Sequence, residues 1–245
     1  MFELKGKSAL VTGAGRGVGL GIARALAVQG ARVVINDLFP ERAAEACHPL
    51  RQQGLAAEHC AFDVTDYAQV SAAVGALGTI DILVNNAGIP GVEGMELKQF
   101  IDTTPAEWRP QVDLNLYGTL NCTHAVLPGM RDRGWGRIVM VSSDAGRAGS
   151  GAGVTVYGSC KAAAVQLVRN LSQEVASLGV TVNAIALGPM DNLPDEYAKW
   201  TVRAIPVARM GRPDDAGAAV VYLASEEAGW VTGQLLAVNG GMNPS

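Results

Sequence analysis

The stretch Ser8-Ala-Leu-Val-Thr-Gly-Ala-Gly-Arg-Gly-Val-Gly19 places a short apolar run directly before a glycine-rich turn and the start of a helical pattern. Glycines at positions 13, 17 and 19 allow a sharp turn and leave backbone amides bare where the helix begins. Such amides bind the pyrophosphate of a dinucleotide, although glycine-rich turns also occur for structural reasons alone. Because the turn directly follows an apolar strand, we interpret it as a nucleotide-binding turn.

Short apolar runs alternate with amphipathic segments along the rest of the chain. The pattern predicts strands at residues 8–11, 32–36, 57–62, 80–84, 137–141, 181–185 and 235–238. It predicts helices at residues 17–29, 41–53, 67–77, 105–131, 157–178 and 214–224. Continuous apolar runs are typical of strands that are buried on both faces of a parallel sheet. We therefore expect an α/β, doubly wound Rossmann fold with about seven parallel strands and helices on both faces.

Length and composition restrict the class of protein. The 245 residues show no linker, repeat or composition shift, so we expect one domain over residues 1–245. A net charge of −4 without a basic stripe argues against nucleic acid, and no apolar run is long enough to span a bilayer. Four cysteines and three histidines stand at no metal-ligand spacing, which favours reduced thiols, a cytoplasmic location and no metal site.

Carboxylates follow the second and third predicted strands. Asp37 stands about 20 residues after the glycine turn, where a carboxylate can accept hydrogen bonds from an adenosine ribose. It would repel a 2′-phosphate, which favours NAD over NADP. Arg16, inside the turn, either meets a phosphate or is a solvated arginine at the helix start. Asp63 and Val64 either cap an adenine ring, or Asp63 is a helix N-cap.

Tyr157 and Lys161 stand four residues apart, so on a helix they lie on one face. An ammonium group near a phenol lowers the phenol pKa from about 10, which makes the tyrosine an acid/base catalyst. The alternative is a buried tyrosine beside a surface lysine. Ser143 closes the fifth predicted strand and can face Tyr157 across a carbonyl group. Asn115 lies within a predicted helix, where asparagine gives no propensity benefit, so it is either a functional residue or a buried structural one.

Together these pieces resemble the classical short-chain dehydrogenase/reductase family nearly end to end. The matching pieces are Thr12-Gly-x-x-x-Gly-x-Gly19, Asp63, Asn85-Asn-Ala-Gly88, Asn115, Ser143, Tyr157-x-x-x-Lys161, Gly211-Arg-Pro213 and Val238-Asn-Gly-Gly241. The resemblance implies a catalytic tetrad of Asn115, Ser143, Tyr157 and Lys161. In that tetrad Tyr157 exchanges the proton, Ser143 holds the substrate oxygen, and Lys161 lowers the tyrosine pKa and binds the nicotinamide ribose. Asn115 holds a water that relays protons.

The expected contacts to the cofactor, NAD rather than NADP, come from fourteen residues. They are Gly13, Arg16, Gly17, Val18, Gly19, Asp37, Asp63, Val64, Asn86, Ala87, Gly88, Tyr157, Lys161 and Pro189. Three departures from the family pattern concern the pocket: Leu187-Gly-Pro189 replaces the usual Pro-Gly, Asn192 replaces a frequent threonine, and the segment from Ser143 to Tyr157 is one residue longer. The resemblance also implies a homotetramer.

The sequence leaves the substrate open. The variable substrate loop of the family corresponds to residues 190–205, where Tyr197 and Trp200 either pack an apolar substrate or are core residues of a helix. Arg147 either meets a phosphate or carboxylate of a hydroxyacyl-CoA or is a solvated loop arginine. We expect an NAD(H)-dependent secondary alcohol dehydrogenase, for a small-molecule substrate such as a hydroxyacyl-CoA or an alicyclic alcohol. The alternatives are an NADPH-dependent 3-oxoacyl-thioester reductase and a non-catalytic nucleotide sensor.

Overall fold

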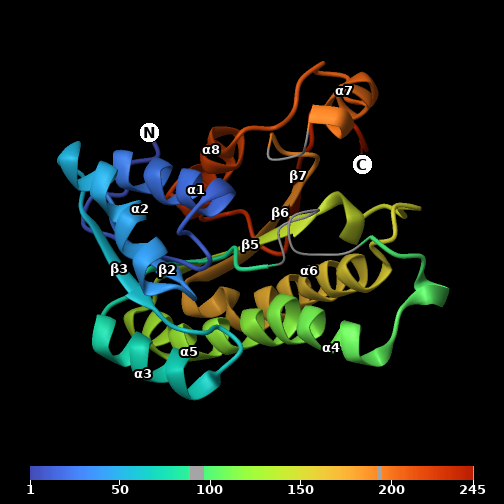
Figure 1. The fold of residues 1–245 in the computed structure, drawn as a ribbon. Helices are drawn as coiled ribbons and strands as arrows, with labels where there is room; N and C mark the ends of the chain where they lie inside the picture. The colour runs from blue at the N-terminus through green and yellow to red at the C-terminus, as the bar shows by residue number, and fades with distance from the viewer. Residues whose placement is uncertain (89–96, 192–194, 245) are drawn as a thin grey trace.

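The computed structural model describes residues 1–88, 97–191 and 195–244, and within them one seven-stranded sheet (Figure 1). The strands are β1 Ser8–Val11, β2 Arg32–Asp37, β3 Ala57–Ala61, β4 Ile82–Asn85, β5 Gly136–Ser143, β6 Val180–Leu187 and β7 Leu235–Val238. Their order is β3-β2-β1-β4-β5-β6-β7, and every neighbouring pair is parallel. The predicted doubly wound α/β fold is confirmed.

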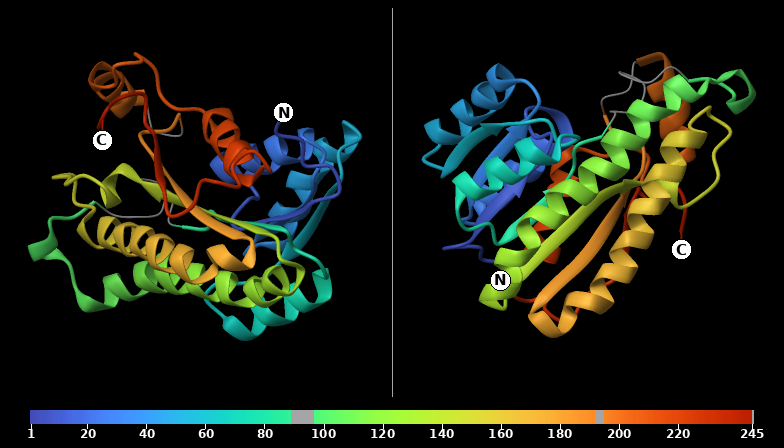
Figure 2. Two further views of the ribbon diagram at one scale, coloured as in Figure 1. Left: turned by 180° about the vertical axis from the view of Figure 1, so that it is seen from behind. Right: turned by 90° about the horizontal axis from the view of Figure 1, so that it is seen from below.

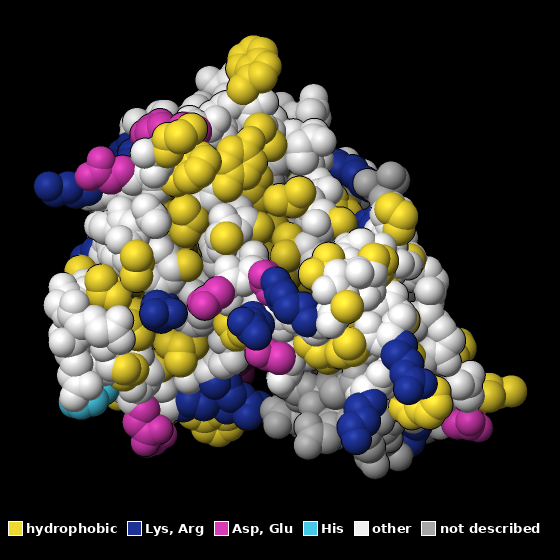
Figure 3. Space-filling view, turned by 90° about the horizontal axis from the view of Figure 1, so that it is seen from above, with side chains coloured by type: hydrophobic (Ala, Val, Ile, Leu, Met, Phe, Trp, Pro, Cys, Tyr) yellow, Lys and Arg dark blue, Asp and Glu magenta, His cyan; other side chains and the backbone are white. Residues whose placement is uncertain are grey.

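Helices cover both faces of the sheet (Figures 1 and 2). They are α1 Gly17–Val28, α2 Pro40–Gln52, α3 Tyr67–Leu77, α4 Pro105–Val112, α5 Gly118–Arg133, α6 Thr155–Val175, α7 Asp195–Ala204 and α8 Pro213–Ala224. Helices α1, α2 and α8 lie on one face, and α3, α4, α5 and α6 lie on the other. Acidic and basic side chains are interspersed on the face that carries α1 and α8 (Figure 3).

Two apolar layers hold the helices to the sheet, because side chains of each strand alternate between its faces. Ile22 and Leu26 of α1 pack with Val11 in one layer, and Met130 of α5 packs with Leu83 in the other. All five side chains are fully buried. Removing an aliphatic side chain of this size from water contributes about 1.5–3 kcal/mol, which is why nearly continuous apolar runs form the centre of this fold.

The predicted elements are confirmed with two corrections. Strands β1 and β7 and helix α3 have the predicted bounds, and the other elements differ at their ends by one to three residues. The single helix predicted over residues 105–131 is wrong, because a π-helical turn, Asp113–Tyr117, separates α4 from α5. The segment 190–205, expected to be the variable substrate loop, contains helix α7, Asp195–Ala204.

Because all seven strands are parallel, their carboxyl ends lie on the same side of the sheet. Strands β1 and β4 are neighbours in space although β2 and β3 lie between them in the chain, so the order reverses there. Ligands of doubly wound sheets bind outside the carboxyl ends of the strands at such a switch point. No helix within the described part of the chain combines the length and apolar character that crossing a bilayer requires.

Candidate active site

A cavity of about 770 Å³ opens at the carboxyl ends of the strands. It is lined by every predicted site residue except one: Gly13, Arg16, Gly17, Val18, Gly19, Asp37, Asp63, Val64, Asn86, Ala87, Gly88, Ser143, Tyr157, Lys161 and Pro189. The exception, Asn115, is buried and does not line the cavity. The fold therefore brings segments from most of the chain into one site.

The glycine turn has a backbone that only glycine adopts easily. Gly13 and Gly17 have φ angles of +59° and +56°, and a Cβ at Gly13 would lie 2.8 Å from the Ala87 Cα. A Cβ at Gly17 would meet nothing within 4 Å, so this position faces open space. Helix α1 begins here without a side-chain cap on its first amides. Bare amides at a helix start fit the pyrophosphate of a dinucleotide.

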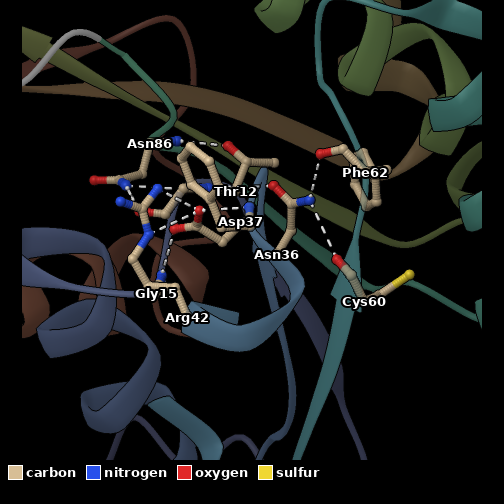
Figure 4. Close-up of polar contacts among 10 residues, drawn as sticks. Thr12, Gly15, Asn36, Asp37, Arg42, Cys60, Phe62 and Asn86 are labelled. Atoms are coloured by element: carbon tan, nitrogen blue, oxygen red, sulfur yellow. Dashed lines mark hydrogen bonds and ion pairs between the residues drawn. The ribbon is translucent and has the colours of Figure 1, made fainter. Parts of the chain in front are cut away.

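Thr12 and Asn86 brace this turn against the end of β4 (Figure 4). The Thr12 hydroxyl accepts hydrogen bonds from the amides of Asn86 and Ala87, both at 3.0 Å. The Asn86 side-chain amide donates to the carbonyls of Thr12 at 2.8 Å and Gly13 at 3.0 Å. Four hydrogen bonds thus fix the position of the turn before any ligand binds.

Asn36, which the sequence analysis did not single out, ties three strand ends together (Figure 4). Its Oδ1 accepts from the Gly13 amide at 3.2 Å, and its Nδ2 donates to the carbonyls of Cys60 and Phe62 at 3.2 and 3.0 Å. A short polar side chain near the end of the apolar run Val33-Val-Ile-Asn-Asp37 was the available signal. A buried amide needs several partners, and a strand end supplies free backbone groups.

Asp37 is buried and already paired. Its Oδ2 accepts from the Gly15 amide at 3.2 Å, and its Oδ1 accepts from the Phe39 amide at 3.1 Å. Arg42 of α2 donates to the same Oδ1 from Nε at 3.0 Å and from Nη2 at 2.5 Å (Figure 4). Arg42 also lines the cavity. The carboxylate predicted to select the cofactor is therefore fixed in place and partly neutralised by a cation that the sequence analysis missed.

Asp63 is not the helix N-cap that the sequence analysis considered. Its Oδ1 accepts from the amide and the hydroxyl of Thr65, both at 2.8 Å, which closes a local turn. The N-cap of α3 is Asp66, whose carboxylate accepts from the amides of Ala68 and Gln69. Asp63 therefore remains at the cavity wall, held by its own turn.

Tyr157 and Lys161 lie on one face of α6, and both reach the cavity. Burial raises the pKa of Tyr157, and a hydrogen bond with the Ser143 side chain opposes that rise. The net shift of the Tyr157 pKa is therefore upward, and its lowering by Lys161 stays a prediction. The Lys161 ammonium lies 5.6 Å from the Tyr157 ring centre and donates to the Val141 carbonyl at 3.0 Å. Burial lowers the Lys161 pKa to about 8.

Asn115 lies in the π-helical turn, directly behind Gly88. Its Nδ2 donates to the Gln111 carbonyl at 3.0 Å, whereas its buried Oδ1 has no partner among the described residues. A Cβ at Gly88 would lie 2.9 Å from this Oδ1 and 3.0 Å from the Lys161 Nζ. The glycine thus lets an unpaired acceptor and a buried ammonium group approach the cavity from the same side.

Other predicted positions have different outcomes. Arg147 forms an ion pair with Asp144 and donates to the Asn243 carbonyl, so it is not a solvated loop arginine. Trp200 is 73% exposed, which excludes the interpretation as a core residue. Asn192 and the side chain of Tyr197 lie outside the described residues.

Among the described residues, neither the cysteines nor the potential metal ligands indicate a disulfide or a metal site. The cysteines are free, and burial raises the pKa of each, that of Cys122 to about 12. Over the described ranges no three His, Cys, Asp or Glu side chains lie together where they could hold a metal ion.

Comparison with known proteins identifies relatives along the whole chain. Residues 13–243 match the family model described as enoyl-(acyl carrier protein) reductase. The chain is 38% identical to the 3-oxoacyl-[acyl-carrier-protein] reductase FabG of Vibrio harveyi, over 98% of this chain and 99% of the relative.

Two solved structures, each 35% identical to this chain, carry bound ligands. A gluconate 5-dehydrogenase from Burkholderia cenocepacia J2315, in complex with NADP and tartrate, superposes with a TM-score of 0.91 over 98% of this chain and 96% of that one. A 7α-hydroxysteroid dehydrogenase, complexed with NADH and 7-oxo glycochenodeoxycholic acid, superposes with a TM-score of 0.90 over 98% and 95%. The chain belongs to the classical short-chain dehydrogenase/reductase family and is an NAD(P)-dependent oxidoreductase that acts on alcohols and ketones.

Proposed function

We propose that this enzyme interconverts a secondary alcohol and a ketone with NAD(H), and that the groups flanking the reacting carbon are uncharged and largely apolar. One observation carries the proposal: Ser143, Tyr157 and Lys161 line one end of the cavity whose other end holds the fixed carboxylate of Asp37. A bound nicotinamide dinucleotide supplies the hydride for ketone reduction and accepts it in alcohol oxidation.

The four side chains of the proposed tetrad have separate roles. In the direction of reduction, the Tyr157 hydroxyl gives its proton to the ketone oxygen, and in oxidation the phenolate takes the proton from the alcohol. The Ser143 hydroxyl donates a hydrogen bond to the same substrate oxygen and holds it beside Tyr157. Lys161 stabilises the phenolate and holds the nicotinamide ribose. Asn115 accepts a hydrogen bond from a water in the proton path, for which its unpaired Oδ1 is the available acceptor.

The proposed preference for NAD rests on the negative charge of Asp37 at the end of the cavity that would hold the adenosine ribose. Asp37 is held by two backbone amides and by Arg42, so it cannot turn away from a 2′-phosphate without losing these bonds. Arg16 and Arg42 line the same cavity and favour a phosphate. We infer that the fixed carboxylate outweighs them, because Arg42 is already bound to that carboxylate.

The substrate class is proposed on the remaining cavity wall. The described lining residues outside the predicted dinucleotide and tetrad contacts include Leu97, Ser150, Ala152, Val154 and Met190, none of which is charged. Arg147 is held by Asp144 and Asn243. A sugar acid such as gluconate would need a cation for its carboxylate, so an acyl thioester or an alicyclic ketone fits this wall better.

A second candidate is NADPH-dependent reduction of a 3-oxoacyl thioester, which is favoured by the 38% identity to a FabG reductase. It differs from the first in the cofactor and in the partner that carries the acyl chain. A third, non-catalytic nucleotide sensing, has little support because the tyrosine and the lysine are both present.

We also propose that residues 190–205 form part of the substrate pocket and that the enzyme is a homotetramer. The first proposal is supported by Met190, which lines the cavity at the start of this segment. The second follows from the family and is supported by a separate apolar hollow of about 400 Å³ between α4 and α6. Phe100 and Trp108 stack at 5.4 Å in its wall, and Phe100 is half exposed.

The test is an absorbance assay of nicotinamide reduction and oxidation, with NAD(H) and NADP(H) in parallel. The ketones are acetoacetyl-CoA, 7-oxo glycochenodeoxycholic acid, cyclohexanone and 5-ketogluconate. We expect turnover with NADH and an apolar ketone or the thioester. Tyr157→Phe should lower kcat by at least about 100-fold while NADH affinity, measured by fluorescence, changes little. Preference for 5-ketogluconate, or retained turnover in Tyr157→Phe, would contradict the proposal.

A further inference from the structure

We propose that Asp144 is a positioning residue that holds the C-terminal segment, residues 239–243, against the turn after Ser143 and so shapes the substrate end of the cavity. Asp144 follows Ser143 directly and begins a short 3₁₀ turn, Asp144–Gly146. Its effect on turnover rests on the proposed function, whereas its effect on the two segments does not.

The carboxylate of Asp144 accepts hydrogen bonds from side chains near the C-terminus. Asn239 Nδ2 donates to its two oxygens at 3.1 and 2.9 Å, and Asn243 Nδ2 donates to Oδ2 at 3.0 Å. Arg147 pairs with Oδ1 at 3.4 Å. Asp144 is 9% exposed, so these bonds form largely out of water, where a charged acceptor makes strong hydrogen bonds and is costly to leave unpaired.

A second set of bonds closes the network. The carbonyl of Asn243 accepts from Arg147 Nη2 and, at 3.1 Å, from Asn239 Nδ2. The Asn239 side chain also accepts from the Gly241 amide at 3.1 Å. Both side chains and one carbonyl of the C-terminal segment therefore depend on Asp144 and Arg147. Since this segment follows the end of β7, no sheet hydrogen bond replaces these contacts.

The network reaches the cavity on two sides. On one side, the Ser143 hydroxyl accepts from the Ala145 amide at 3.2 Å, and Asp144 lies between these two residues in the chain. On the other side, a Cβ at Gly188 would lie 2.8 Å from the Asn239 Cβ, and Gly188 lines the cavity. Asp144 therefore joins the wall that carries Ser143 to the wall that follows β6.

The C-terminal segment also contacts the region after α7. The Val207 amide donates to the Gly240 carbonyl at 3.1 Å, and a Cβ at Gly240 would lie 2.6 Å from the Ile205 side chain. Ile205 is buried and ends the proposed substrate segment. Release of residues 239–243 would thus loosen the substrate end of the cavity, whereas the glycine turn and Asp37 lie on other strands and would stay in place.

The variant that tests this is Asp144→Asn, which keeps the shape but removes the charge and one acceptor. Hydrogen exchange of the ligand-free protein is the first measurement. We expect the amides of Ala145, Arg147, Ala148, Gly241 and Met242 to exchange at least about tenfold faster, because each donates within this network or its turn. Asn243→Ala, which removes a donor from the other side, should give the same pattern at the C-terminal segment. Asp132→Asn, an exposed acid of α5, is the matched control and should change nothing.

The second measurement separates a positioning role from a purely structural one. With the panel ketone that the unchanged enzyme reduces fastest, Asp144→Asn should raise the ketone KM about tenfold and change NADH affinity less than about twofold. A lower Tm with an unchanged ketone KM would overturn the positioning role, and unchanged exchange of the named amides would overturn the tie itself. If the unchanged enzyme reduces no ketone of the panel, the proposed function fails, while the exchange result still decides whether Asp144 holds the segment.

Discussion

At the residue scale, Lys161 has the most demanding environment of the site. Its ammonium group is buried, with the Val141 carbonyl as hydrogen-bond acceptor, and its pKa falls to about 8 from 10.5. A buried charge lowers the free energy of unfolding unless it is paired, and proteins keep such charges mainly where function needs them. The residue that the proposed chemistry needs is thus one that the fold tolerates at a cost.

This cost predicts a dependence of stability on pH. Between about pH 8 and 10.5 the unfolded chain binds one proton more at Lys161 than the folded chain, so the lysine penalty shrinks as the pH rises through this window. We expect Lys161→Met to be more stable than the unchanged protein at pH 7, and this advantage to decrease between pH 8 and pH 10. Urea unfolding at several pH values measures it. A difference that stays constant would show that Lys161 is not held at a lowered pKa.

The raised pKa of Tyr157 predicts that the two directions of the reaction respond differently to pH. Reduction uses the neutral phenol, which is present throughout the neutral range, so its rate should change little there. Oxidation uses the phenolate, so its rate should increase toward alkaline pH. Lys161→Ala should move the oxidation profile further to alkaline pH, because the phenolate loses its cationic neighbour. A profile that does not move would exclude this role of the lysine.

Arg42 predicts a change in the choice of cofactor. Its guanidinium partly cancels the Asp37 charge, so Arg42→Ala should expose the full charge to a 2′-phosphate. We expect the ratio of kcat/KM for NADP to that for NAD to fall about tenfold in Arg42→Ala and to rise in Asp37→Ala. Arg24→Ala, an exposed arginine of α1, is the control. A ratio that does not fall in Arg42→Ala would contradict this role of the arginine.

At the element scale, we expect a glycine-to-alanine substitution to destabilise the glycine turn and to stabilise a helix. Gly13 has a φ of +59° and no space for a Cβ, whereas Gly75 lies inside α3 with nothing within 4 Å of its Cβ position. We expect Gly13→Ala to abolish NADH binding and lower Tm. Gly75→Ala should stabilise the protein by about 0.5–1 kcal/mol without affecting binding. Thermal unfolding and NADH fluorescence measure both, and equal effects at the two positions would refute the special role of the turn.

The sequence predicted elements well where one physical cause dominates. Apolar runs predicted the strands because burial is their main driving force. The predicted bounds of α3 and β7 are those of the structure. The π-helical turn around Asn115 was not predictable, because it depends on packing against α6, which is distant in the sequence. Most site residues were predictable from their positions after strands. The Asp37–Arg42 pair and the Tyr157 pKa were not, because both depend on distances and burial that spacing does not contain.

At the scale of the whole molecule, the second hollow predicts assembly. Apolar residues of α4 and α6 and the stacked Phe100 and Trp108 line it. We expect light scattering after gel filtration to give the mass of a tetramer, and Phe100→Glu to shift the protein to smaller species because the charge would be buried. Trp230→Glu, at a fully exposed site outside the hollow, is the control. A monomer at all concentrations for the unchanged chain would contradict the proposed tetramer.

The bracing of the glycine turn by Thr12, Asn36 and Asn86 has a consequence for how such an enzyme can change over time. Their bonds run to one another and to backbone groups, and none runs to Ser150, Val154 or Met190 on the substrate wall. Mutations in that wall therefore leave the dinucleotide cradle intact. A gene with this architecture can be duplicated and drift toward a new substrate while each intermediate still binds its nucleotide, which gives selection a working starting point at every step.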